Sequence, residues 1–529
     1  MPSKKRTARP PAVPLTTAQS LGALVKSARQ IMRKDKGLNG DLDRLPMLTW
    51  IMFLKFLGDL EEMREQEAKL ARAKFRPAIE PPYRWRDWAA DPRGITGDDL
   101  LAFINQDECR RPDGKRGPGL FAYLRGLTSA NGDDRRDVIA TVFRGVDNRM
   151  RSGYLLRDVI NRVAAIHFTS HEELHTLGAL YETMLREMRD AAGDSGEFYT
   201  PRPVVRFMVE VTDPRLGEAV LDPASGTGGF LVEAFSHLAK QVRTVEDRRV
   251  LQGKSLFGCE PKSLPYLLCQ MNLLLHGLDA PRIDAGNSLR FKLSDVGEKD
   301  RVDVILTNPP FGGEEEKGIQ GNFPEDMRTS ETALLFLQLI MRRLRKASKP
   351  GHGPARAAVV VPHGTLFGDG VCARIKEQLL KEFNLHTIVR LPDGVFAPYT
   401  DIPTNILFFD RSGPTREIWY YELPRPEGRK KYSKTQPLRF EEFAPAIAWM
   451  RAKKRAENTQ AWKVPVDDVL RYDDSGRLLS CNLDRKNPNA PNDIEHLPPQ
   501  ELLARIRARE KEIQEALHEI QQTIELSQE

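Results

Sequence analysis

The stretch EAVLDPASGTGGF, residues 218–230, sets the fold that we expect for this chain. The short β-prone run 219–221 leads into Asp222 and a glycine-rich turn, and apolar residues recur at helical spacing from Phe230 onward. A strand, a glycine turn and a helix in this order open a doubly wound α/β sheet, which binds ligands at the carboxyl ends of its strands. No Gly-Lys-Ser/Thr ending follows the turn, so we do not expect a phosphate-binding loop.

The residues of this turn suit a ligand that carries both an amine and a carboxylate. Gly226 and Gly228 allow the backbone to approach a ligand closely, because glycine has no Cβ. Asp222, together with Ser225 or Thr227, supplies hydrogen-bond acceptors and donors. The candidate ligand-binding residues of the turn are Asp222, Ala224, Ser225, Gly226, Thr227 and Gly228.

Two further segments fit a ligand site at the same edge of the sheet. The next predicted strand, 255–259, is followed by Glu260, and an acid at this position can accept both hydroxyls of a ribose. Upstream, Thr200 and Pro201 are expected to start a helix. On its own this is an ordinary loop-to-helix entry, but beside a ligand site it would cover a bound cofactor. The candidate residues of this segment are Glu197, Phe198, Tyr199, Thr200 and Pro201.

A later strand ends in the residues that indicate the chemistry. The β-prone run 302–307 is followed directly by Asn308, Pro309, Pro310 and Phe311. The Asn308 side-chain oxygen and the Pro309 carbonyl can accept the two hydrogens of an exocyclic amino group on a nucleobase, which favours a pyramidal nitrogen. The prolines fix the geometry of both acceptors, and Phe311 offers a face for a base taken out of the duplex. The alternative is a strand-ending turn with a buried phenylalanine.

The composition indicates the size class and the redox compartment of the protein, but it does not identify a binding partner. With 529 residues the chain exceeds one domain, and a net charge of +6 with an isoelectric point near 8.9 permits contact with nucleic acid without demanding it. Five scattered cysteines without a C-x-x-C pair indicate reduced thiols in a cytoplasmic protein, neither a disulfide framework nor a zinc site. The pattern predicts no signal peptide and no membrane span.

Patterning divides the chain into four parts. A disordered basic N-terminus, 1–14, precedes a helical domain, 15–170, in which apolar residues recur at helical spacing. The α/β core is expected over 171–480, and a linker with a coiled-coil-like helix over 481–529. In the core, a series of helix, strand, helix, strand and strand completes the sheet over 334–344, 357–361, 371–380, 387–391 and 404–409.

Three loops of the core each leave two interpretations open. The glycine-rich, acidic loop 312–326 is either a cover over a bound base or a plain surface loop. Phe396 and Tyr399 either flank the base or belong to a packed loop. The run 425–434, with its basic residues around Tyr432, is either a phosphate contact or a solvated loop.

The last helix carries an apolar stripe that needs a partner. Its apolar residues follow heptad spacing, with Glu510 as the one break. The stripe either packs on its own domain or joins another helix. Its two rows are Leu503, Leu517 and Ile524, and Ile506, Ile513 and Ile520.

The order of these motifs resembles the γ-type amino-methyltransferases that act on adenine in DNA: a glycine loop, an acid after the next strand, and Asn-Pro-Pro-Phe after a later strand. The wider chain, from the helical region through LPDGVFAPYTDIPTNILFF (391–409) to the tail, is similar to the modification subunits of type I restriction-modification systems. The resemblance implies S-adenosylmethionine as cofactor and N6 of a flipped-out adenine as acceptor. It also implies double-stranded DNA, a specificity subunit on the C-terminal helix, a second copy of the chain and a restriction subunit as partners.

Carried over by motif, residues 197–201, 222–228 and Glu260 hold the cofactor, and residues 308–311 hold the target base. One departure is Asn287, which stands where many relatives carry an aspartate that meets the cofactor's adenine amino group. An amide oxygen can still accept that hydrogen bond. A sulfonium is already an activated methyl donor, so neither a metal nor a covalent intermediate is needed.

We therefore expect a cytoplasmic, site-specific DNA adenine-N6 methyltransferase whose specificity comes from a partner. One alternative is a self-sufficient DNA methyltransferase or a methyltransferase of another defence system. A methyltransferase that modifies a protein glutamine would hold a similar amide, but Phe311 and the basic run 425–434 argue against it. The remaining rival is a non-catalytic cofactor-binding scaffold, against which the intact motif residues argue.

Overall fold

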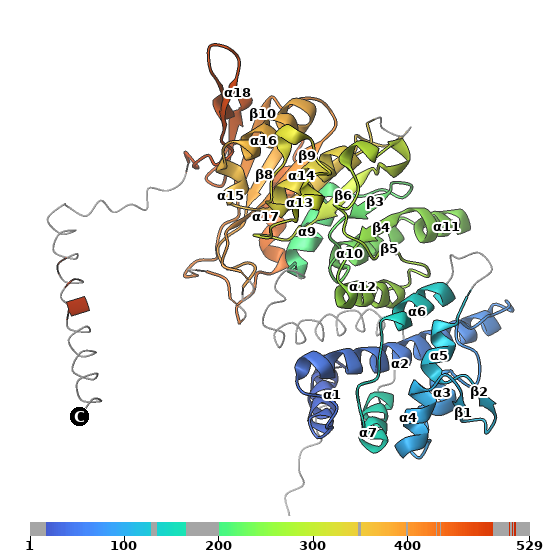
Figure 1. The fold of residues 1–529 in the computed structure, drawn as a ribbon. Coiled ribbons are helices and arrows are strands. Elements are labelled where there is room, and N and C mark those ends of the chain that lie inside the picture. Colours follow the sequence, from blue (N-terminus) through green and yellow to red (C-terminus); the bar gives the residue numbers. More distant parts are fainter. Residues whose placement is uncertain are drawn as a thin grey trace, which may run out of the picture.

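A computed structural model shows a helical N-terminal domain beside an α/β core (Figure 1). The structure describes residues 17–128, 135–165, 200–346, 351–397, 400–429, 431–433 and 435–489, with residues 507, 510, 513 and 514. The apolar stripe of the last predicted helix therefore lies outside the described residues, except for Glu510 and Ile513.

The first domain is helical because its apolar residues recur at helical spacing and meet in one core. Its longest helix is α2 (Asp41–Leu70), on which Trp50, Phe53 and Phe56 have no exposed surface. The remaining elements are α1 (Thr17–Met32), α3 (Trp85–Trp88), α4 (Gly97–Asn105), β1 (Cys109–Arg110), β2 (Arg116–Gly117), α5 (Leu120–Arg125), α6 (Arg135–Arg144) and α7 (Gly153–Ala164).

A nine-stranded sheet, in the order β11-β10-β8-β9-β7-β6-β3-β4-β5, forms the second domain. Strands β3 to β7 are parallel, whereas β9 is antiparallel to both β7 and β8. The strands are β3 (Val220–Asp222), β4 (Leu256–Cys259), β5 (Arg282–Asp284), β6 (Val304–Thr307), β7 (Arg356–Pro362), β8 (Asn384–Arg390), β9 (Thr404–Asp410), β10 (Glu417–Glu422) and β11 (Ala461–Pro465).

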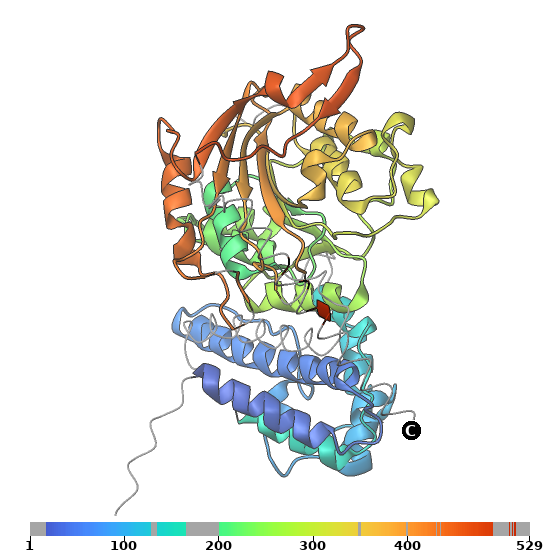
Figure 2. The ribbon, with the colours of Figure 1, turned by 90° about the vertical axis from the view of Figure 1, so that its left-hand side faces the viewer.

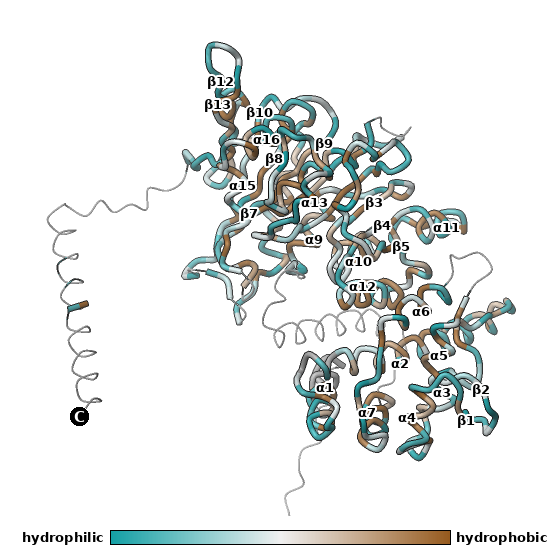
Figure 3. Tube along the Cα trace, in the orientation of Figure 1, coloured by the Kyte–Doolittle hydropathy of each residue, from teal (hydrophilic) through white to brown (hydrophobic). Residues whose placement is uncertain are grey.

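Helices cover both faces of this sheet, as the alternation of its side chains requires. Val304 and Leu306 of β6 pack with α9, α10, α12 and α17, whereas Ile305 packs with α14 and α16. Hydrophobic segments gather inside the core, and hydrophilic loops lie outside (Figure 3). The helices are α9 (Arg202–Thr212), α10 (Gly229–Ala239), α11 (Val245–Lys254), α12 (Ser263–Leu275), α13 (Lys317–Gln320), α14 (Thr332–Arg343), α15 (Gly364–Phe367), α16 (Val371–Glu382), α17 (Ala444–Arg451) and α18 (Val466–Val469).

The predicted doubly wound α/β fold is confirmed, and so is the series of helices and strands after residue 334. The structure also contains strands that the sequence patterns did not predict. β10 and β11 extend the sheet beyond β8, and a hairpin of β12 (Leu470–Tyr472) and β13 (Leu478–Cys481) packs against α16. All five cysteines are free and buried. None of the helices that the structure describes is long and apolar enough to cross a membrane.

Helix α12 joins the two domains. Cys269 and Leu273 pack into the α/β core, whereas Leu268 and Met271 belong to the core of the helical domain. An ion pair between Arg64 and Asp279, 2.9 Å apart, closes the rim of this contact. Figure 2 shows the helical domain on one side of the core, with α12 at the boundary.

Candidate active site

Asp222 stands at the end of β3 with one carboxylate oxygen unused. Its exposed fraction is 1%, and Oδ1 accepts hydrogen bonds from the Ala224 N–H at 3.1 Å and the Thr307 hydroxyl at 2.8 Å. The second oxygen, Oδ2, is buried and has no partner among the described residues. Burial raises the pKa of Asp222 to about 7. The buried Oδ2 of Asp222 can therefore accept a hydrogen bond from a donor on a ligand.

The glycine turn after Asp222 depends on two backbone conformations that favour glycine. Gly226 has a φ of +51° and Gly228 a φ of +81°. A Cβ at Gly228 would lie 2.8 Å from the Sγ of Cys269 on α12, so a larger residue does not fit. The Gly226 N–H donates to Glu260 at 3.0 Å, which joins the turn to the end of β4.

Two polar side chains fix the shape of the turn. The Ser225 hydroxyl donates to the Asp222 carbonyl at 2.8 Å and accepts from the Cys259 N–H at 3.0 Å. The Asn272 amide donates to the Thr227 carbonyl at 3.0 Å. Because its hydroxyl is engaged within the protein, Ser225 serves a ligand site by shaping the turn.

Glu260 and Asn287 follow the next two strands, β4 and β5. Each Glu260 oxygen accepts one backbone N–H, from Gly226 at 3.0 Å and from Lys262 at 2.9 Å. The Asn287 Oδ1 accepts from the Leu289 N–H at 2.8 Å. The Asn287 oxygen has room for a second hydrogen bond, because an amide oxygen has two lone pairs.

Asn308 leaves the sheet directly after β6, next to the end of β3. Its Nδ2 donates to the Thr200 hydroxyl at 3.0 Å, whereas its Oδ1 is buried and has no partner among the described residues. The bond to Thr200 fixes the orientation of the amide, so the oxygen is the atom left to accept from a ligand. Buried acceptors in proteins are normally hydrogen-bonded, so an unpaired Asn308 Oδ1 indicates a ligand-binding role.

Helix α9 connects the segment that carries Thr200 to the glycine turn. Pro201 caps the helix, and the next residue, Arg202, donates to the Gly229 carbonyl at 2.7 Å. Burial lowers the pKa of Arg202 to about 10. The structure thus brings Thr200, Asp222 and Asn308 to one edge, while Glu197, Phe198 and Tyr199 lie outside the described residues.

Of the aromatic residues that the sequence offered for nucleic-acid contact, Phe396 contacts Phe311 and Tyr432 is buried in the core. Phe396, 4% exposed, meets the half-buried Phe311 edge to face, with ring centroids 6.4 Å apart. Tyr399 lies outside the described residues. Tyr432 has no exposed surface, and its hydroxyl donates to Glu442, so the structure removes it from the candidate nucleic-acid contacts of the basic run.

Three residues that support the site by hydrogen bonds were not predicted from the sequence. Thr307, Asn272 and Arg202 are polar residues within apolar or helical stretches, and each bonds to a motif residue. A polar residue inside a buried strand was the available signal for Thr307. The partner of each residue is distant in the chain, so the pattern alone could not name it.

Two family models match the sequence of this chain. Residues 172–478 match the model described as N-6 DNA Methylase, and residues 21–163 match the HsdM N-terminal domain. The methylase subunit of the type I restriction enzyme EcoEI from Escherichia coli is 47% identical over 509 residues, which cover 95% of this chain and 97% of that one. The chain belongs to the methylase subunits of type I restriction enzymes.

Solved structures extend this similarity to the fold. A modification subunit assigned to a type I restriction enzyme of Vibrio vulnificus YJ016 has 71% sequence identity and a TM-score of 0.87, covering 92% of this chain and 100% of that one. A chain from a study of complex assembly in a type I restriction-modification system has 40% identity and a TM-score of 0.70, covering 97% and 99%. As a type I methylase subunit, the protein is a DNA methyltransferase that modifies N6 of adenine.

Proposed function

We propose that this type I methylase subunit transfers a methyl group from S-adenosylmethionine to an adenine held outside the duplex by residues 308–311. The buried Asn308 Oδ1, oriented by the bond from Nδ2 to Thr200, is the observation that carries the proposal. With the Pro309 carbonyl it can accept both hydrogens of the adenine amino group and favour a pyramidal nitrogen. Phe311, backed by Phe396, offers the face on which the base rests.

The residues at the ends of β3, β4 and β5 suit S-adenosylmethionine. The free Oδ2 of Asp222 suits a cationic group, and the glycine turn gives the backbone a close approach. Glu260, a carboxylate that follows β4, suits the ribose hydroxyls, and Asn287 suits the adenine amino group through the second lone pair of its amide oxygen. When bound, the cofactor supplies a methyl group that its sulfonium has already activated.

The chain's own residues align the acceptor and exclude water. Asn308 and Pro309 hold the nitrogen from one side, and the buried walls of the site strengthen these hydrogen bonds. The proton that the nitrogen releases can leave to water after the transfer, so no general base is assigned.

The proposed assembly follows from the family and from the C-terminal stripe. We infer that the apolar rows within 503–524 join helices of a specificity subunit, with a second copy of this chain on its other side and a restriction subunit as a further partner. The specificity subunit would bring the complex to its double-stranded DNA site. A DNA substrate and five free thiols support a cytoplasmic location.

The substitution Asn308→Ala tests the proposed catalytic role. We expect it to lower methyl transfer to DNA by about a hundredfold or more, because the acceptor acts on the reacting nitrogen. Binding of S-adenosylmethionine, measured by calorimetry, should stay unchanged. Asn161→Ala is a matched control, because the Asn161 Oδ1 in the helical domain is also buried and without a partner among the described residues. Equal loss of transfer and cofactor binding in Asn308→Ala would make this residue structural.

A further inference from the structure

Phe367 is an exposed aromatic residue on a rigid turn. It ends α15, directly after β7, and 49% of its surface is exposed. The preceding residue, Leu366, has no exposed surface, and its carbonyl accepts from the Leu483 N–H at 2.7 Å. The backbone of Phe367 is therefore anchored while its ring projects outward.

A buried lysine holds the turn on both sides of this ring. Lys376 of α16 has no exposed surface, and its Nζ donates to the carbonyls of Leu366 and Gly368, each at 2.9 Å. Gly368 packs so closely on α16 that an added Cβ would lie 2.9 Å from the Sγ of Cys372. Burying an ammonium group is expensive unless its hydrogen bonds are satisfied, so this arrangement indicates that the position of Phe367 matters.

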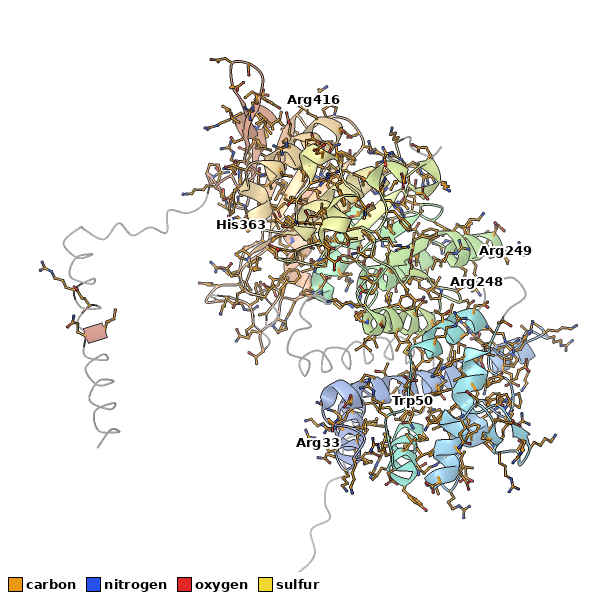
Figure 4. The ribbon with its side chains drawn as sticks, in the orientation of Figure 1. Arg33, Trp50, Arg248, Arg249, His363 and Arg416 are labelled. Atoms are coloured by element: carbon orange, nitrogen blue, oxygen red, sulfur yellow. The ribbon has the colours of Figure 1, made fainter. Side chains whose placement is uncertain are left out.

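Phe367 lies at the same edge of the sheet as the target-base motif. Thr307 pairs with Val359 of β7, and β7 continues to Pro362, about 10 Å further along the strand direction, whereas β6 gives way to Asn308. His363 follows, and its ring meets that of Phe367 at a centroid distance of 5.5 Å. Figure 4 shows His363 on the side of the core away from Arg248 and Arg249 of α11.

One loop connects the target-base motif to this exposed ring. Phe396 of the loop between β8 and β9 contacts Phe311. At the other end of the loop, Ile402 is 46% exposed, and the Pro403 carbonyl next to it accepts from the His363 N–H at 2.9 Å. Phe367 and Ile402, two of the exposed large apolar side chains of the described chain, thus stand on segments that meet at His363, at the sheet edge that carries Asn308.

We propose that Phe367 and Ile402 form an apolar wedge that enters the DNA duplex beside the target adenine and fills the space that the extruded base leaves. This inference rests on the proposed function. Apolar side chains inserted at a base step make up for lost stacking, and base extrusion requires that stacking be broken. Arg485 and Lys486, which follow His363's partner Asp484, supply cations for the neighbouring phosphates.

The test compares two DNA duplexes in single-turnover methylation by the complete complex with its specificity subunit. In one duplex the target adenine is paired with thymine; in the other it faces an abasic position, so that extrusion needs no unpairing. Phe367→Ala should lower the rate about tenfold or more on the paired duplex and leave it nearly unchanged on the abasic duplex. Ile402→Ala should show a smaller effect of the same kind, and Phe367→Trp should retain the wild-type rate.

Tyr154→Ala is the matched control, because this aromatic residue of α7 is 69% exposed and belongs to the helical domain. It should leave both rates unchanged. Fluorescence of 2-aminopurine at the target position should report reduced extrusion in Phe367→Ala. Equal losses on both duplexes, or no loss on either, would overturn the wedge. Failure of the wild-type complex on both duplexes would instead contradict the proposed function.

Discussion

The ionisation state of the buried Asp222 carboxyl group should control the affinity for the positively charged group of the proposed cofactor. Its pKa is raised to about 7 by burial, so near neutral pH the protonated and ionised forms are both populated. A cationic ligand favours the ionised form. The affinity for S-adenosylmethionine should therefore rise as the pH increases through about 7 and level off above it.

Asp222→Asn should remove this pH dependence, because an amide does not titrate in this range. Calorimetric titrations one pH unit below and one above the pKa measure it directly. The stability of the free protein changes in the opposite sense. The folded pKa lies above the unfolded value of about 3.9, so the contribution of Asp222 to stability falls as the pH rises from about 4 to about 7. A pH-independent affinity in the wild type would contradict the proposed contact.

Some residues of the site could be predicted from the sequence because their conformation or position is encoded locally. Gly226 and Gly228 adopt the left-handed backbone expected of a glycine turn, and Asn308 follows a buried strand as predicted. The bond between Thr200 and Asn308 spans 108 residues, and no local pattern specifies it. Whether an oxygen of Asp222 or Asn308 lacks a donor depends on tertiary neighbours, so no local pattern indicates the unused oxygens that both residues have among the described residues.

The short helix α15 is fixed to α16 by hydrogen bonds from Lys376. Lys376→Met keeps the volume of the side chain but removes the donor to the Gly368 carbonyl and one of the two donors to the Leu366 carbonyl, which retains the Leu483 N–H. We expect the free energy of unfolding to fall by roughly 1–3 kcal/mol. Urea unfolding measures this change. The control is Lys381→Met on the same helix, whose side chain is 60% exposed and pairs with Glu377, and which should change stability little. Similar stabilities for the two variants would refute the supporting role of Lys376.

At the level of elements, the parallel half of the sheet was predictable and its far edge was not. Strands β6 and β7 of this half carry continuous apolar runs, VIL and AAVVV, which indicate strands buried on both faces. β10 reads EIWYYE, whose isoleucine, tryptophan and tyrosines favour a strand that we did not predict, whereas β11 contains a lysine and ends in a proline, so its pattern resembles that of a loop. β10 pairs with β8 and β11 pairs with β10, and both pairings are tertiary contacts that a local pattern does not specify.

At the scale of the whole molecule, we expect the two domains and the tail to have separable roles. The helical domain covers the outer face of α12, whereas residues 502–529 lie beyond the last strand of the core. Ending the chain at residue 501 should abolish binding to the specificity subunit, because it removes the apolar stripe. Binding of S-adenosylmethionine should persist, because no candidate cofactor residue is removed. Co-purification and calorimetry measure the two properties, and an intact complex would refute the proposed role of the tail.

Sequencing DNA for N6-methyladenine tests the central claim most directly. Cells would carry the wild-type gene, the Asn308→Ala allele or no gene. We predict methylation at a split sequence with a fixed gap in the wild type, because the two half-site readers of a specificity subunit produce such a gap, and none in the other two strains. Methylation that persists with Asn308→Ala, or that is the same with and without the gene, would contradict the account.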